Sequence, residues 1–162
     1  VTILLAKLSP KEAQEIKNNR PKSTETYEYY QRGKYISGKF ANTVQEEDFV
    51  FAEQLLKNAI RLDPNYANSY ASLSNLYNTY YNSRHCNTKS DSLKYMQLQE
   101  AYLDTAIIID PNSSEVYLTQ GWVKYSKGEY TDAMYQKQYK CSEGLIEIRV
   151  QGHQAAILCK EK

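Results

Sequence analysis

Glycine and proline are scarce in this chain, with only six glycines and four prolines among 162 residues. Regular alternation of polar and apolar residues, which is typical of a half-buried strand, is almost absent before residue 144. Apolar residues recur instead at the spacing of an α-helix. The length is that of about one ordinary domain, which can bury a core without disulfides or metals.

Neither sign of charge predominates, because the formal net charge is +1 at pH 7. Nucleic acids and anionic membranes attract basic proteins, so neither partner is expected. No apolar run approaches the roughly 20 residues that a membrane-spanning helix needs. The first ten residues, VTILLAKLSP, lack the basic and long apolar regions of a signal peptide. The chain does not begin with Met, and we interpret it as a piece of a longer protein.

Cysteine is scarce as well: Cys86, Cys141 and Cys159 are odd in number and form no C-x-x-C pair. A disulfide framework is therefore not expected, and a reducing, cytoplasmic setting fits better. A zinc site that joins these cysteines to His85 and His153 is disfavoured, because its ligands would have to converge from distant segments. The glycine pattern of a phosphate-binding loop is missing. We therefore predict no catalytic residue, no metal and no cofactor, and we do not expect an enzyme.

Tyrosine is abundant, with sixteen residues. A tyrosine ring fills space while its hydroxyl stays polar, so tyrosine suits half-buried helix seams and binding faces. Helical patterning is clearest in residues 51–62, FAEQLLKNAIRL, where apolar residues form one stripe and charges lie on the other side. The stripe ends at Asp63-Pro64, because proline disfavours helix in the residue before it and can open the next helix.

This helix end recurs 47 residues later, where residues 106–121 repeat much of residues 59–77. The matching residues are Ala59, Ile60, Asp63, Pro64, Asn65 and Tyr70 in the first copy and Ala106, Ile107, Asp110, Pro111, Asn112 and Tyr117 in the second. Neither helix of a pair can bury its apolar stripe alone, whereas stacked pairs can. The predicted fold is therefore all-α, with helix pairs repeated along the chain.

The spacing resembles the tetratricopeptide repeat, a helix–turn–helix unit of 34 residues. Its small and large positions are matched by Gly33, Ala52, Leu56, Ala59, Pro64, Tyr70, Leu73, Ser74, Tyr77, Leu103, Ala106, Pro111, Tyr117, Gly121, Gly128, Tyr130 and Ala133. The resemblance implies a right-handed superhelical stack of about three helix pairs over residues 24–143. The expected units are 24–66, 67–113 and 114–143.

Two of these units are longer than the motif. Seven extra residues lie between Gly33 and Ala52, and thirteen lie between Tyr77 and Ala106. The longer excess falls in residues 80–96, whose middle is polar and rich in turn-forming residues. We expect a protruding loop, flanking helices extended by a turn or two, or a mixture of both, which we favour.

The start of the chain carries a further pattern: LLAKLSPKEAQEI, then Arg20-Pro21, then TETYEYYQRGKY. It resembles the region that follows a TolB-like domain in a class of bacterial signalling proteins, where tetratricopeptide repeats come next. The resemblance implies a linker helix over 1–23 and a parent protein with an adenylate or guanylate cyclase, winged-helix or kinase domain. Nothing in this chain carries the chemistry of those domains.

The tail, residues 144–162, departs from the repeat pattern. GLIEIRVQG (144–152) alternates like a strand, and HQAAILCK (153–160) could form one or two helical turns. A solvating cap helix or an irregular segment is the alternative for this tail.

The resemblance also implies where a partner binds, because the first helices of such repeats line a concave groove. Asparagine can hydrogen-bond a peptide backbone and aromatic rings supply rigid contact area, although these rings could simply pack between helices. A clamp for a C-terminal carboxylate is disfavoured because the groove positions are mostly uncharged, and stacking on nucleic acid is disfavoured for lack of a basic groove. The expected groove residues are Tyr27, Tyr30, Lys34, Asn68, Asn75, Asn78, Leu118, Trp122 and Tyr125.

The expected function is therefore that of a protein–protein interaction scaffold. Its groove would bind a peptide or helix of a partner protein, or another domain of the parent chain, without turnover. A module for homo-oligomerisation is the alternative.

Overall fold

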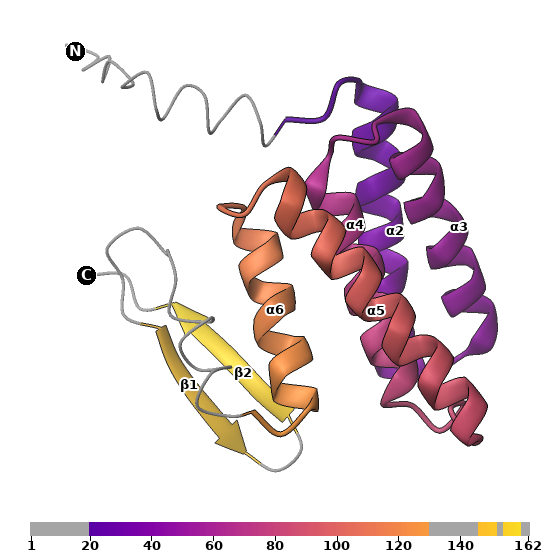
Figure 1. The fold of residues 1–162 in the computed structure, drawn as a ribbon, viewed down its shortest axis with the longest axis vertical. Coiled ribbons are helices and arrows are strands. Elements are labelled where there is room, and N and C mark those ends of the chain that lie inside the picture. The colour runs from indigo at the N-terminus through magenta and orange to yellow at the C-terminus, as the bar shows by residue number, and fades with distance from the viewer. Residues whose placement is uncertain (1–19, 130–145, 152–153, 160–162) are drawn as a thin grey trace.

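The computed structural model describes residues 20–129, 146–151 and 154–159, and within the first of these ranges every regular element is a helix (Figure 1). The all-α prediction is thus confirmed for residues 20–129. The linker helix expected over 1–23 falls, up to residue 19, outside the described residues. The helices are α2 (Thr24–Thr43), α3 (Glu46–Leu62), α4 (Ala67–Tyr81), α5 (Lys89–Ile109) and α6 (Ser114–Ser126).

Two short strands follow in the tail, β1 (Ile146–Gln151) and β2 (Gln154–Cys159). They pair antiparallel, with Ile146 opposite Cys159. The strand expected at 144–152 is confirmed by β1, but the helical turns expected at 153–160 are wrong. A short apolar run does not distinguish helix from strand by itself, and here β1 supplies a ladder of backbone partners for β2.

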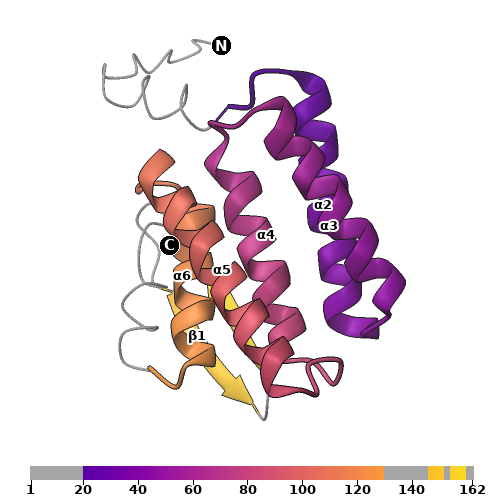
Figure 2. The ribbon, with the colours of Figure 1, turned by 45° about the vertical axis from the view of Figure 1, so that its right-hand side comes forward.

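The helices form antiparallel pairs that pack side by side (Figure 2). α2 pairs with α3 and α4 pairs with α5, while α4 also contacts α2, α3 and α6. α2, α4 and α6 therefore lie next to one another, with α4 in the middle. The hydrophobic core lies between the pairs, and its fully buried side chains include Phe40, Leu56, Leu73, Leu76 and Tyr77.

The recurring Asp-Pro-Asn phrase is a hydrogen-bonded turn in both copies. The Asp63 carboxylate accepts the backbone N–H of Asn65 at 3.1 Å, and the Asp110 carboxylate accepts that of Asn112 at 3.1 Å. Both aspartates are buried. Because proline has no N–H, the aspartate carboxylate accepts the N–H of the residue after proline. This turn ends one helix just before the next begins.

The two longer units are extended at the same end of the stack. A connection of only two residues joins α2 to α3, and a loop over residues 82–88 joins α4 to the 21-residue α5. The extra residues in 80–96 therefore form both a loop and added helix, as favoured from the sequence. Aromatic rings from these ends form a cluster, which we call the aromatic cluster: Phe40, Phe49, Tyr77, Tyr80 and Tyr95.

The aromatic cluster joins all four helices of the two units. The Tyr80 ring lies 4.2 Å from the ring of Phe49 and 4.2 Å from that of Tyr95, measured between centroids. Phe40 is completely buried and lies 6.1 Å from Tyr80. Such pairs contribute roughly 0.5–1.5 kcal/mol each beyond their buried area. The extensions thus enlarge the core as well as lengthening the helices.

Gly33 allows α2 and α3 to approach closely. A Cβ atom at this position would lie 2.8 Å from Leu56 Cγ and 3.3 Å from Leu55 Cβ, and Leu56 is completely buried.

We predict that Gly33→Ala lowers the free energy of unfolding by about 1–3 kcal/mol, because the buried leucine must move. Gly38→Ala in the same helix is the matched control: no atom lies within 4 Å of its added Cβ. It should stabilise by up to about 1 kcal/mol through helix propensity. Urea unfolding measures both, and equal effects would contradict the close packing.

Buried tyrosines predict a loss of stability in alkali. Burial raises the pKa of Tyr66 to about 12, and burial raises the pKa of Tyr30, Tyr77 and Tyr80 well above the usual value of 10.0. The folded protein therefore keeps protons that the unfolded chain releases above pH 10, so stability is complete below pH 10 and falls as the pH rises toward 12. Urea unfolding at pH 9, 10 and 11 measures this. Tyr77→Phe should reduce the slope, and a stability that does not change over this range would contradict the prediction.

Candidate functional site

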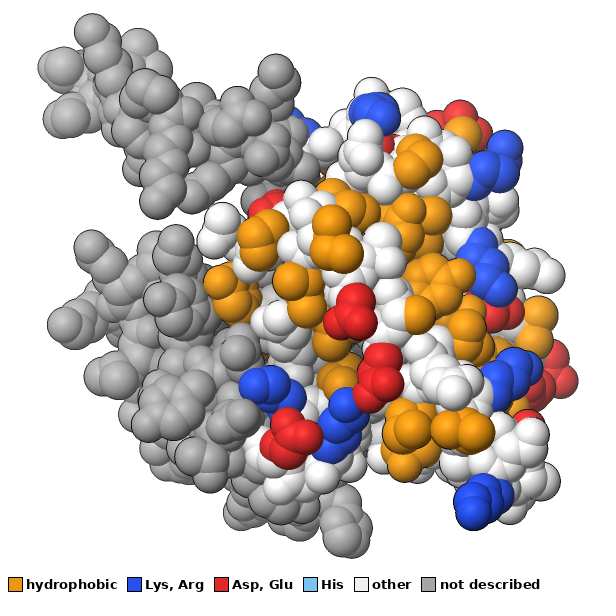
Figure 3. All heavy atoms as spheres, in the orientation of Figure 1, with side chains coloured by type: hydrophobic (Ala, Val, Ile, Leu, Met, Phe, Trp, Pro, Cys, Tyr) orange, Lys and Arg blue, Asp and Glu red, His pale blue; other side chains and the backbone are white. Residues whose placement is uncertain are grey.

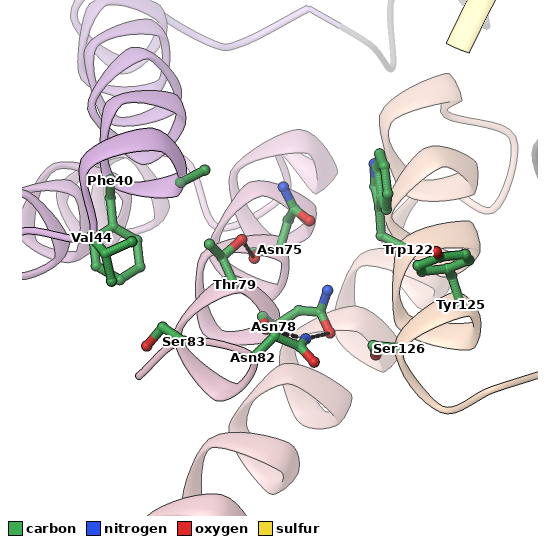
Figure 4. Close-up of a pocket in the computed structure, with 11 residues that line it drawn as sticks. Phe40, Val44, Asn75, Asn78, Thr79, Asn82, Ser83, Trp122, Tyr125 and Ser126 are labelled. Carbon is green, nitrogen blue, oxygen red and sulfur yellow. Dashed lines mark hydrogen bonds between the residues drawn. The ribbon is translucent and has the colours of Figure 1, made fainter. Parts of the chain in front are cut away.

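A cavity of about 710 Å³ opens where α2, α4 and α6 lie next to one another. Figure 4 shows Trp122 and Tyr125 on α6 across the opening from Phe40 and Val44 on α2, with asparagines of α4 between them. We call this cavity the groove. Its lining residues carry no charged side chain; they are Phe40, Ala41, Val44, Asn75, Asn78, Thr79, Asn82, Ser83, Trp122, Tyr125 and Ser126.

A smaller cavity of about 190 Å³ continues the groove toward the start of α2 and shares Ala41, Asn75 and Thr79 with it. Lys34 and Glu115 also line this cavity, and their side chains form an ion pair at 2.6 Å. The groove therefore has an uncharged, aromatic end and a narrower, polar end.

The ion pair at the polar end joins α2 to α6 across α4. Glu115 also accepts the hydroxyl of Ser72 at 3.2 Å, and Lys34 donates to the Tyr30 hydroxyl at 3.4 Å. Burial, together with the negative charge of Glu115, raises the pKa of Tyr30, so this hydroxyl stays protonated. The four side chains hold α2, α4 and α6 at fixed spacing.

Asparagine side chains form the floor of the groove because residues 75, 78 and 82 share one face of α4 and its end. Asn82 donates to the backbone carbonyl of Asn78 at 2.7 Å, and Asn78 is buried. Asn75 is half-buried and its amide makes no hydrogen bond to any residue that the structure describes. Its donor and acceptor are therefore available to a ligand.

The aromatic wall consists of Trp122 and Tyr125, both half-buried. Their rings meet edge to face, with 6.2 Å between centroids and 86° between planes. This edge-to-face contact orients the two rings relative to each other.

Five of the nine expected groove residues line the two cavities: Lys34, Asn75, Asn78, Trp122 and Tyr125. The other four line neither. Tyr30 is only 4% exposed and packs edge to face on Tyr66. Asn68 accepts the Ser113 hydroxyl at 2.6 Å and so ties α4 to the start of α6. Tyr27 lies at the start of α2 with 46% exposure, and Leu118 is half-buried on α6.

Several groove residues were not expected from the sequence, among them Phe40, Val44, Thr79, Asn82 and Ser83. They lie at the extended ends of the helices, outside the register of a 34-residue repeat. Helical spacing could have found three of the unexpected residues. Ala41 follows Lys34 by two helical turns, Val44 follows Ala41 by three residues, and Asn82 follows Asn78 by four.

A further cavity, of about 380 Å³, lies between α5 and α6, and charged side chains such as Glu100, Asp104 and Lys124 line it. Figure 3 shows the face over α3 and α5, where charges of both signs are interspersed with apolar side chains. No cluster of histidine, cysteine, aspartate and glutamate among the described residues is suited to a metal ion, and no described helix could cross a bilayer.

Comparisons with protein-family models, with curated proteins and with solved structures found no match to this chain.

The Lys34–Glu115 pair should stabilise the stack measurably. Its two side chains are 46% and 16% exposed, so the pair is only partly screened by water. We predict a coupling free energy of about 0.5–1 kcal/mol in a cycle of Lys34→Met, Glu115→Gln and the double variant. The coupling should shrink when the salt concentration is raised from 0.05 to 1 M. Additive effects at low salt would contradict a bridge across the groove.

Proposed function

We propose that the chain is a helical-repeat scaffold of the tetratricopeptide kind whose groove binds an extended, uncharged segment of a partner protein. The groove itself is the observation that carries this proposal. Ligand sites are typically concave, about 300–1,000 Å³ in volume, and lined by aromatic side chains with a few polar groups. The groove has about 710 Å³ and a lining of this kind.

The order of helix contacts supports the repeat character. α2 contacts α3 and α4, and the same relations hold between α4, α5 and α6. Small residues stand at the contacts: Ala52, Ala59, Ala71, Ala106 and Gly121 are all buried. Together with the recurring aspartate turns, this supports successive units that differ mainly in length.

The composition of α4 supports a binding role for the side of the helix that lines the groove. Asparagine and threonine favour helix poorly, yet Asn75, Asn78 and Thr79 follow one another on the groove side of this central helix. Alanine, leucine or lysine would favour the helix more at these places. Residues that oppose the local structure are typical of functional surfaces.

The lining also indicates the kind of segment that binds. An extended segment leaves its backbone N–H and C=O groups unpaired, and the Asn75 amide can meet one of each. Its apolar side chains can contact the Trp122 and Tyr125 rings. A charged side chain would lose water without gaining an opposite charge at the aromatic end, which is costly.

We also propose that the partner is a separate protein or another domain of a larger bacterial signalling protein. The resemblance of residues 1–80 to the region after a TolB-like domain supports this origin. Homo-oligomerisation is the second candidate. Ile108 on α5, which is 83% exposed, favours it because an exposed isoleucine suits a subunit contact.

A peptide-display selection with the intact chain tests the groove. We expect it to return peptides with uncharged, aromatic-containing cores. Asn75→Ala should weaken the best of them by about 5- to 100-fold, because a buried polar contact is worth roughly 1–3 kcal/mol. Ala41→Trp, which fills the point shared by both cavities, should abolish binding.

Gln54→Ala is the matched control, since Gln54 is exposed on α3, away from the groove. It should bind the peptides as the wild type does. Peptides that bind Asn75→Ala and Ala41→Trp with unchanged affinity would contradict the proposal. Sedimentation equilibrium of the free protein separates the second candidate, because a monomer at high concentration excludes it.

A further inference from the structure

The loop over residues 82–88 folds back onto the α2–α3 connection through His85. The His85 Nε2 atom lies 2.8 Å from the carbonyl oxygen of Val44, and its Nδ1 atom lies 3.4 Å from a carboxylate oxygen of Glu46. The imidazole stacks on the Tyr80 ring at 5.9 Å between centroids, with 23° between planes. Both ring nitrogens of one loop histidine thus face acceptors on the neighbouring helix pair.

A neutral imidazole satisfies only one of these acceptors. A carbonyl oxygen can only accept, so the 2.8 Å contact places a proton on Nε2. In the neutral ring, Nδ1 then points a lone pair at the Glu46 carboxylate, which is repulsive. The facing Glu46 oxygen is itself buried and accepts no hydrogen bond from any described residue. A second proton on His85 supplies that missing donor and adds opposite charge.

The contact at Val44 falls on a strained residue. Val44 ends α2 with φ 53° and ψ 39°, and it is the only described residue other than glycine with a positive φ. A β-branched residue is disfavoured in this left-handed region. Strain of this kind persists where the surroundings hold it, often at ligand clamps and switches. Here the surroundings include the histidine that bonds the Val44 carbonyl.

The strained residue and the loop both belong to the groove. Val44 lines its aromatic end, and so do Asn82 and Ser83 from the loop. The Ser83 hydroxyl also accepts the backbone N–H of His85 at 3.2 Å, so the loop wall and the histidine are connected directly. The His85 contacts therefore position part of the groove wall.

We propose that the 82–88 loop is a proton-dependent latch that completes the aromatic end of the groove when His85 is doubly protonated. As a regulatory device for that site, it rests on the proposed function. The latch closes when the imidazole carries two protons, because both acceptors are then bonded, and it loosens when the imidazole carries one. Peptide affinity therefore falls as the pH rises.

The charged and titratable groups near His85 come from α3, α4 and α5, and its chain neighbour Arg84 adds a positive charge. α3 presents Glu46, and α4 presents Tyr80, whose hydroxyl also bonds Glu46 at 3.3 Å. α5 presents Tyr95, which packs behind Tyr80. The nearby Asp48 is already paired with Lys39 of α2 at 2.8 Å, and Val44, which caps α2, contributes its carbonyl.

Hydrogen exchange of the free protein tests the latch. At pH 5.5, 6.5 and 7.5, after correction for intrinsic exchange, the amide hydrogens of residues 82–88 should lose protection with rising pH, by up to about tenfold per pH unit for one linked proton. His85→Gln should remove this response. His153→Gln, which changes the chain's only other histidine, should retain it. Glu46→Gln should keep the loop protected at pH 7.5, because its amide can donate to neutral Nδ1.

Equal loop protection at all three pH values in the wild type would overturn the proposal, and so would an unchanged response in His85→Gln. The wild-type series requires no variant, so a folding defect cannot obscure it. The measurement also requires no peptide. A responsive loop in a protein that binds no peptide would contradict only the proposed function, and peptide binding with an unresponsive loop would contradict only the latch.

Discussion

The structure depends on the packing of α4 against every other described helix. Ten of its fifteen residues are buried, and many of them are small. Ser74 donates its hydroxyl to the Gln99 carbonyl of α5 at 2.7 Å, and Ala71 is completely buried beside α6. Small side chains allow neighbours to approach on all sides, which fixes where α2 and α6 stand and leaves the asparagine face of α4 between them.

The groove follows from this arrangement and from the extended helix ends. Phe40, Val44 and Tyr80 lie in the additional turns at the helix ends. Without these turns, neither the aromatic cluster nor the aromatic end of the groove would form. The same extension brings His85 to the α2–α3 connection. Added length therefore produces the features that distinguish this chain from a plain stack of equal helix pairs.

Much of the fold could be predicted from local physics, whereas the full extent of the site could not. The Asp63-Pro64 stop and the small Gly33 act within a turn or one helix contact, so the proline located the first and the resemblance to the repeat motif indicated the second. Residues such as Val44 and Ser83 line the groove through tertiary contacts at the extended helix ends, and the register of the repeat does not include them. β2 was missed because a strand in a short apolar run is decided by its partner, and Tyr30 was placed on the surface because the register does not show that Tyr66 covers it.

The central claim is that a partner segment lies in the groove between α2 and α6. The most direct measurement is an NMR titration that follows the backbone amides, the side-chain NH₂ groups of the asparagines and the indole N–H of Trp122 while the best selected peptide is added. The account predicts the largest shift changes at Asn75 and Trp122, and smaller ones along α3 and α5. Largest changes around Ile108 on α5, or none at Asn75 when the peptide is bound, would contradict it.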